Sequence, residues 1–195
     1  DVCSSDLAQM LDRARLRVRR ARLGSLVQLV RGDIRHLPFP DRRFSLVMAP
    51  YGILQSLLRE RDLAATLDAV HRVLRPGGVF GLELVADLPA WEEYKKRVSL
   101  KGWRGPDKRA HVSLVESVRQ DRRRRLTIFD QEFTERRGRT KVVRRFALTF
   151  RTLSVPQMTR RLERAGFEVT ALLGDYQGGP WDPRAEVWVV LARKP

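Results

Sequence analysis

A carboxylate that directly follows a buried strand is the first group in this chain with the placement needed for ligand chemistry. Asp33 comes after the apolar segment 27–30, which is typical of a short strand. Ligands of open parallel sheets bind beyond the carboxyl ends of the strands, so a side chain there can accept a hydrogen bond from a ligand. The alternative is an ordinary turn, because an isolated Gly-Asp pair usually only shapes a loop.

A second group lies near the end of the chain, in the loop 174–183 with the sequence GDYQGGPWDP. Its Asp175 and Tyr176 could orient an amine or a hydroxyl, or accept a proton from one. The plainer interpretation is a Gly- and Pro-rich loop in which Trp181 packs on the sheet edge. Glu83, in an apolar segment further upstream, is either a buried acid or one that faces a cleft, and the sequence does not choose.

The segments that must position these groups alternate between helices and apolar strands. Residues 7–21 carry an apolar stripe at helical spacing that ends at Gly24, and residues 62–74 form a second amphipathic helix. Strands are predicted at 27–30, 44–49 and 79–84. This alternation indicates an α/β fold, in which a parallel sheet carries helices on both faces.

The pattern changes between residues 87 and 152, where apolar and polar residues alternate as they do in antiparallel strands. The turn-like Arg-Arg-Gly-Arg at 136–139 predicts a hairpin, so we expect a lid rather than a second domain. A helix then begins with Ser154 as its N-cap and Pro156 in its first turn. The last strands are predicted at 167–173 and 186–192.

Composition limits the class of protein without selecting a ligand. The chain has 195 residues, 43% of them hydrophobic, which suits one globular domain. A net charge of +16 would suit a polyanionic partner, yet 33 of the 39 basic residues are Arg dispersed among 23 acids, which is typical of a solvated surface. The single cysteine, Cys3, excludes a disulfide framework. No apolar run is long enough for a membrane span or a signal peptide, which predicts a cytoplasmic protein.

Three motifs in a defined order carry a resemblance to a known family. Gly32-Asp33 is followed by Leu-Pro-Phe-Pro-Asp at 37–41, and after a helix by Arg-Pro-Gly-Gly at 75–78. In this order they resemble the second half of a class I S-adenosylmethionine-dependent methyltransferase of the small-molecule type. One departure is Ser45, where the family usually has Asp. The resemblance implies a Rossmann-like methyltransferase sheet, mostly parallel with an antiparallel edge strand, and an antiparallel β lid.

The resemblance also implies roles for single residues. Asp33 would accept a hydrogen bond from the adenine amino group of S-adenosylmethionine, and Ile34 would present its amide and an apolar face to the ring. The implied catalytic residues are Tyr51, Asp175 and Tyr176. The implied cofactor-binding residues are Gly32, Asp33, Ile34, Ala49, Tyr51 and Gln55. No metal is implied, because the sulfonium of the cofactor activates the methyl group itself.

The part of the chain before these motifs departs from the family. No Gly-rich loop follows a first strand upstream of Asp33, although that loop is the family's main cofactor cradle. The opening residues, DVCSSDL, resemble the translation of a sequencing-library adapter. We therefore expect residues 1–7 to be a non-native leader. Residues 8–195 would form a partial methyltransferase domain that lacks its first strand or strands, with the lid at 87–152, and would bind S-adenosylmethionine weakly or not at all.

These observations predict that the intact bacterial parent protein transfers a methyl group from S-adenosylmethionine to a nitrogen, oxygen or carbon atom of a small molecule. The charge favours a different class, an RNA or other nucleic-acid methyltransferase, but only Trp103 and Phe129 lie near the lid arginines as platforms for bases. The missing cradle favours a third class, a non-catalytic methyltransferase-like protein. No membrane partner is expected, and the sequence leaves the methyl acceptor and the oligomeric state open.

Overall fold

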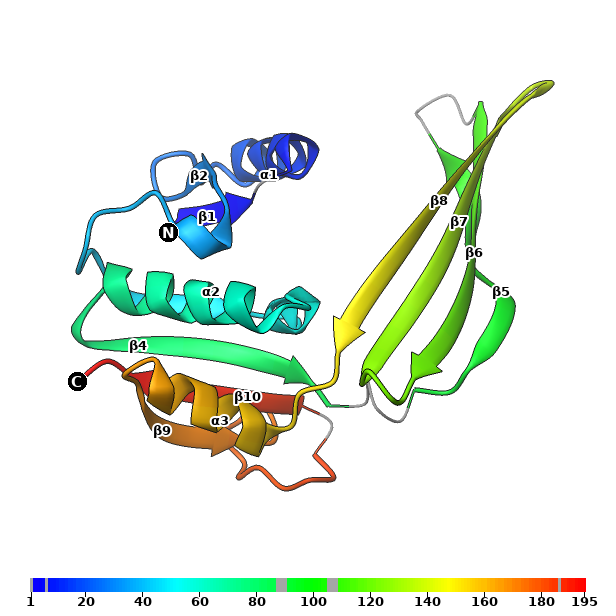
Figure 1. Ribbon diagram of the computed structural model, residues 1–195. Helices are drawn as coiled ribbons and strands as arrows, with labels where there is room; N and C mark the ends of the chain where they lie inside the picture. Colours follow the sequence, from blue (N-terminus) through cyan, green and yellow to red (C-terminus); the bar gives the residue numbers. More distant parts are fainter. Residues whose placement is uncertain (1, 6, 87–90, 105–108, 186) are drawn as a thin grey trace.

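Three sheets make up the structure, a computed structural model that describes residues 2–5, 7–86, 91–104, 109–185 and 187–195. A two-stranded sheet with helix α1, a four-stranded sheet with helices α2 and α3, and a long antiparallel lid sheet follow one another along the chain (Figure 1). The lid stands beside the four-stranded sheet and extends away from it (Figure 1). Within the described residues, every helix is too short or too polar to cross a bilayer.

The two-stranded sheet contains β1 (Val2–Ser5) and β2 (Gln28–Arg31), paired in parallel and joined by α1 (Ala8–Arg20). The helix predicted from the apolar stripe is confirmed, but of the residues in that stripe only Leu11 is buried. A strand thus precedes the helix, within the stretch that the sequence reading set apart as a leader. The non-native origin of residues 1–7 stays a prediction.

The four-stranded sheet combines a parallel and an antiparallel part. β3 (Phe44–Ala49) runs parallel to β4 (Leu74–Val85), and α2 (Glu60–Val73) connects them. β4 pairs antiparallel with β10 (Val187–Arg193), which pairs antiparallel with β9 (Glu168–Leu173). The predicted antiparallel edge is confirmed, but the parallel strands are divided between two sheets, because β2 does not pair with β3.

Both helices of this unit cover the same face of the sheet. Alternate residues of β4, Phe80 and Leu82 among them, form one buried core with apolar residues of α2 and of α3 (Val155–Arg164). The intervening residues of β4 point to the other face. On that face Leu46 and Met48 of the neighbouring strand β3 are 52% and 68% exposed. The expectation of helices on both faces is therefore wrong for the described part of this sheet, since α1 packs on β2 instead.

The Arg-Pro-Gly-Gly segment begins β4 rather than preceding it. The sequence predicted a turn at 75–78 and a strand from residue 79, whereas the strand starts at Leu74. Its register with β3 breaks between Phe44 and Leu46, and Gly77 has a φ of +74°, in the region that favours glycine. The predicted turn is thus a bulge within the strand, because the bonding to β3 resumes at once.

The lid is an antiparallel meander of four long strands. They are β5 (Tyr94–Arg104), β6 (Ala110–Asp121), β7 (Leu126–Arg137) and β8 (Thr140–Arg151). The predicted hairpin joins β7 to β8. After β8 the chain enters α3, which Ser154 caps with its side chain in a reciprocal capping box with Gln157, as the sequence indicated.

One ion-pair cluster ties the lid to the core helices. Glu60, at the start of α2, accepts hydrogen bonds from Arg161 of α3 at 2.6 Å and from Arg151, the last residue of β8, at 2.7 Å. The hydrogen bond from Arg161, with a further one from Arg151, lowers the pKa of the Glu60 carboxyl to about 2. The carboxylate is 54% exposed, so solvent screens the cluster and its contribution to stability is small.

This cluster predicts a pH-dependent effect of Glu60→Gln. Because the folded pKa of Glu60 lies below its ordinary value, its contribution is complete above about pH 4.5 and disappears as the pH falls through about 2. We expect Glu60→Gln to lower the thermal unfolding midpoint slightly at neutral pH and not at all near pH 2, measured by circular dichroism. Glu163→Gln, on the exposed side of α3, is the control. An equal effect of Glu60→Gln at both pH values would contradict the prediction.

Candidate functional site

Three strands end where the sequence predicts ligand binding. Asp33 lies two residues after β2, Tyr51 lies two residues after β3, and Val85 ends β4. Each of these strands runs parallel to a neighbour, so these positions are at carboxyl ends, where α/β sheets bind ligands. The candidate site is built around Tyr51 and the end of β4.

Asp33 caps a short 3-10 turn, Ile34–His36, and is held by one arginine. Its carboxylate accepts hydrogen bonds from the Arg35 amide at 2.9 Å and from Arg35 Nη2 at 2.6 Å. Arg35 also reaches Asp62 of α2 at 3.2 Å, so the turn Ile34–His36 is attached to that helix. The hydrogen bonds from Arg35 lower the pKa of Asp33 to about 2, so the group is an ionised acceptor at neutral pH.

Tyr51 has a strained backbone conformation, and the glycine that follows it lies close against Gln55 and Val85. The φ of Tyr51 is +57° and its side chain is 82% exposed, while its amide donates to Glu83 Oε2 at 3.2 Å. Gly52 follows at φ +62°, and a Cβ on it would meet Gln55 Oε1 and a methyl group of Val85 at 2.6 Å. A non-glycine residue in the left-handed region costs free energy, and such residues often mark functional sites.

Two of the predicted site residues, Tyr51 and Tyr176, interact with the carboxylate of Glu83. Glu83 lies on β4, two residues before the strand ends, and Tyr176 approaches it from the loop between β9 and β10. Desolvation of the phenol, then the charge of Glu83 and a hydrogen bond to it, raises the pKa of Tyr176. Of the two sequence interpretations of Glu83, the structure supports the acid that faces a site.

The side-chain amide of Gln55 is hydrogen-bonded to the end of β4 and is therefore not available to a ligand. Gln55 is fully buried, its Oε1 accepts from the Val85 amide at 2.8 Å, and its Nε2 donates to the Val85 carbonyl at 3.4 Å. Both ends of the side-chain amide are thus used. Gln55 positions the last residue of β4 against the loop that carries Tyr51.

Asp175 is also occupied within its own loop. Its Oδ1 accepts hydrogen bonds from the amides of Gln177 and Gly179, both at 2.8 Å, which folds the loop and places Tyr176 at its exposed tip. Among the other predicted residues, Gly32 lies against Pro38, and Ala49 packs on the main core. Ile34 begins the turn that Asp33 caps.

The sequence analysis missed two arginines that hold loops in place, Arg35 beside Asp33 and Arg72 near the start of β3 and β4. Arg35 binds Asp33 as described, and Arg72 of α2 donates to the carbonyls of Leu37 and Phe39 at 2.7 and 2.8 Å and to Asp41 at 2.7 Å. The spacing of basic residues carries no signal for such bonds, because the same residue type also covers the solvated surface. Arg72 explains how the loop 37–41 is held under the sheet.

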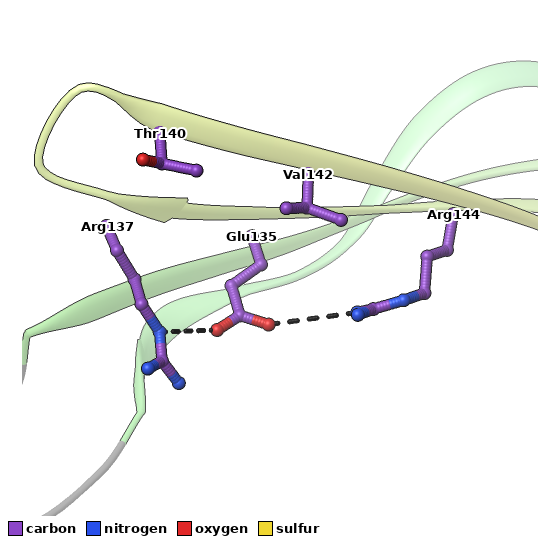
Figure 2. Close-up of a pocket in the computed structure, with 5 residues that line it drawn as sticks. All are labelled: Glu135, Arg137, Thr140, Val142 and Arg144. Atoms are coloured by element: carbon purple, nitrogen blue, oxygen red, sulfur yellow. Dashed lines mark hydrogen bonds and ion pairs between the residues drawn. The ribbon is translucent and has the colours of Figure 1, made fainter.

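A shallow hollow at the tip of the β7–β8 hairpin lies apart from this site. Figure 2 shows Glu135 between Arg137, at 2.8 Å, and Arg144, at 3.8 Å. The carboxylate is paired on both sides, and the hairpin tip is the end of the lid that points away from the core (Figure 1). We therefore assign it no role in the candidate site.

Comparisons with known proteins relate the chain to methyltransferases. A general methyltransferase-domain family model matches residues 2–78. The chain is 34% identical over 95 residues to a demethylmenaquinone methyltransferase of Lactobacillus johnsonii, and 33% identical over 72 residues to a sterol 24-C-methyltransferase of Aspergillus fumigatus. An S-adenosylmethionine-dependent methyltransferase of Clostridium acetobutylicum superposes with a TM-score of 0.79 at 16% identity, over 98% of this chain and 74% of that one.

Residues 2–78 match a methyltransferase domain, and the chain as a whole has the fold of S-adenosylmethionine-dependent methyltransferases. Two further methyltransferase structures share the whole fold, lid included. CcbJ of Streptomyces caelestis superposes with a TM-score of 0.75 at 19% identity over 99% of this chain and 74% of its own. The glycopeptide N-methyltransferase MtfA, in complex with S-adenosylhomocysteine, gives 0.61 at 25% identity over 100% of this chain and 72% of its own.

The curated methyltransferases match only part of their length. The alignment with the Lactobacillus johnsonii protein spans 45% of this chain and 37% of that protein, and the alignment with the sterol methyltransferase spans 37% and 18%. The matched family region ends at residue 78, inside β4. It therefore includes Asp33 and Tyr51 but not Glu83 or Tyr176, and the roles of these residues are matters for proposal.

Proposed function

We propose that this methyltransferase chain serves methyl transfer from S-adenosylmethionine to a small-molecule acceptor. The observation that carries the proposal is the group of Tyr51, Glu83 and Tyr176 at the carboxyl edge of the sheet, next to the end of β4 and under the base of the lid. The whole-chain likeness to a glycopeptide N-methyltransferase supports a small-molecule acceptor.

The cofactor is proposed to lie between the turn Ile34–His36 and the Tyr51 loop. Asp33 would accept from the adenine amino group beside the hydrogen bonds that it accepts from Arg35, and Ile34 would contact the ring. Gly32, Ala49, Tyr51 and Gln55 complete the proposed binding set, with Gln55 acting through Val85. When bound, the sulfonium supplies an activated methyl group, so the chain's own contribution is orientation and proton handling.

The proton released by the acceptor is proposed to pass to Glu83. As the acceptor atom forms its bond to the methyl carbon, the carbon–sulfur bond breaks and its electron pair stays on sulfur. The proton of the acceptor then needs a base within hydrogen-bond reach. Tyr176, whose pKa is raised in part by the charge of Glu83, is proposed to orient the acceptor or relay this proton. Asp175, proposed from the sequence as a catalytic residue, is assigned the folding of the loop that carries Tyr176.

A nucleic-acid acceptor is the less favoured candidate. It would need unpaired basic side chains along one face for phosphates, yet several lid arginines are paired with acids. Arg119 binds Asp130 at 2.8 Å, and Arg145 binds Glu132 at 2.9 Å. Trp103, one of the two aromatic platforms named above, packs edge-on against His111 instead of standing free.

Asp33→Ala tests the cofactor assignment directly. A hydrogen bond to a charged acceptor contributes about 1.5–3 kcal/mol, so we expect the affinity for S-adenosylhomocysteine to fall tenfold or more. Isothermal titration calorimetry of the wild type and the variant measures it, or nuclear magnetic resonance titration where binding is weak. Asp12→Ala, which removes a carboxylate paired with Arg15 on α1, is the matched control. Equal affinity of wild type and Asp33→Ala would rule out the adenine assignment.

A further inference from the structure

One row of residues crosses the outer end of the lid on a single face. It contains, each directly opposite the next, Trp103 of β5, His111 of β6, Arg136 of β7 and Lys141 of β8. We call these residues the basic row. Neighbouring strands lie about 4.8 Å apart, so the row is about 14 Å wide. It lies beside the β7–β8 turn, at the end of the lid that points away from the core (Figure 1).

The two cations of the basic row face each other without an acid between them. Arg136 and Lys141 are directly opposite across β7 and β8, an arrangement in which like charges repel. Arg145, on the same face of β8, is by contrast opposite Glu132 and paired with it at 2.9 Å. Within the part of the chain that the structure describes, neither Arg136 nor Lys141 forms an ion pair. Their charge is therefore open to compensation by an anionic partner.

The other face of this end of the lid is also cationic and partly apolar. Figure 2 shows Arg137 and Arg144 on either side of Glu135, so these three side chains keep a net positive charge. Arg139 lies in the turn between β7 and β8. Phe146, on the same face as Arg144, is 52% exposed. Positive charge and apolar surface thus surround the outer end of the lid instead of occupying one side of it.

Trp103 places an exposed indole at one end of the basic row. Its ring contacts His111 edge-on at 5.3 Å, which orients the indole, yet 64% of the residue is exposed. An indole has an apolar body and a polar N–H group, and it is favoured where water meets the apolar part of a bilayer. Basic side chains near such an indole are attracted to anionic lipid head groups.

This arrangement fits a bilayer surface better than a nucleic acid. A single strand of nucleic acid follows one groove and stacks its bases on several aromatic rings, whereas the basic row contains one such ring. A bilayer interface can surround a projecting end of a protein. It offers phosphates to the cations on both faces, and an apolar boundary to Trp103 and Phe146.

We propose that the outer end of the lid binds the surface of a lipid bilayer that contains anionic phospholipids. Arg136 and Lys141 contact the head-group phosphates, and Trp103 lies at the boundary with the acyl chains. The sequence analysis expected no membrane partner because it found no spanning segment, but binding to a bilayer surface needs none. The inference goes beyond the proposed function and is independent of it, because it uses no residue of the candidate site.

Removal of both charges, in the double variant Arg136→Gln with Lys141→Gln, tests the proposal. The probe is a vesicle of equal parts phosphatidylserine and phosphatidylcholine, and co-sedimentation measures binding. We expect the wild type to bind these vesicles but not vesicles of phosphatidylcholine alone, and the affinity to fall at least tenfold in the double variant. The variant should fold, because it removes a repulsive pair, and circular dichroism checks this.

The matched control is the double variant Arg13→Gln with Arg17→Gln, which removes the same charge from exposed positions of α1. It should bind the vesicles as the wild type does. An equal loss of binding in both double variants would overturn the proposal, because only the net charge would then matter. Absence of vesicle binding by the wild type would overturn it as well. So would binding to a single-stranded oligonucleotide, but not to vesicles, that depends on Arg136 and Lys141, since the partner would then be a nucleic acid.

Discussion

Replacing Glu83 by Gln is expected to lower the rate of methyl transfer at least 100-fold in the active methyltransferase while leaving its affinity for S-adenosylhomocysteine unchanged. A positioned general base contributes about 10²–10⁴-fold to a rate, and Gln cannot take up the proton that the acceptor releases. Glu83 is the acid that meets both tyrosines of the site, since its carboxylate accepts from the Tyr51 amide and interacts with the Tyr176 hydroxyl. Transfer of a labelled methyl group under single-turnover conditions measures the effect.

A second readout for Glu83 does not depend on activity. Because the charge of Glu83 contributes to the raised pKa of Tyr176, Glu83→Gln should return that pKa toward its ordinary value. Near-ultraviolet absorbance follows phenolate formation by the chain's three tyrosines, and the raised pKa of Tyr94, caused by Glu116, is common to the wild type and the variant, so the difference between them reports on the site. Glu168→Gln, which removes an exposed acid paired with Arg193 on β9, is the control. An unchanged rate together with an unchanged Tyr176 titration would contradict the assignment of Glu83.

The sequence predicted the elements well wherever a local pattern specifies them. The apolar spacing of α1 and α2, the apolar run of β3 and the Ser-x-x-Gln start of α3 all depend on neighbours within a few residues. The hairpin at 136–139 is likewise local. These features were confirmed because capping and one-sided burial, which stabilise them, depend on residues that are close together in the sequence.

Long-range features of the fold were not predictable in this way. Periodicity shows that a strand such as β3 is apolar, but it does not show which of its faces a helix covers. Leu46 and Met48 match the buried residue Phe80 in hydrophobicity, yet they lie on the face without helices. The division of the parallel strands between two sheets is a property of pairing across distant segments, and no single segment encodes it.

The candidate site shows the same limit at the level of side chains. Asp33 and Tyr51 were placed correctly after their strands by the apolar segments 27–30 and 44–49, and a resemblance supplied only their implied roles. The same resemblance could not show that Arg35 occupies Asp33 or that Asp175 turns into its own loop. Such partners depend on rotamers and on loops that meet only in the folded chain, which is also why Glu83 stayed undecided.

Gln55→Leu is expected to lower the free energy of unfolding by about 1–3 kcal/mol, because it leaves two part-buried backbone groups of Val85 without their partners. Leu is close to Gln in volume, so lost packing is small and the effect reports on hydrogen bonding. Chemical denaturation followed by circular dichroism measures it. Ser56→Ala is the matched control, since the Ser56 hydroxyl donates to the Ile53 carbonyl from an exposed position and its loss should cost less than about 1 kcal/mol.

The same variant separates stability from site geometry. Val85 links two regions, because its backbone is held by Gln55 while its side chain packs against Val118 and Phe129 at the base of the lid. Freed from Gln55, the end of β4 can shift relative to the Tyr51 loop, and Glu83 lies two residues earlier on the same strand. We therefore expect Gln55→Leu, at a temperature where it remains folded, to disturb the Tyr176 titration as well. A destabilised protein with a wild-type Tyr176 titration would show that Gln55 supports the fold without positioning the site.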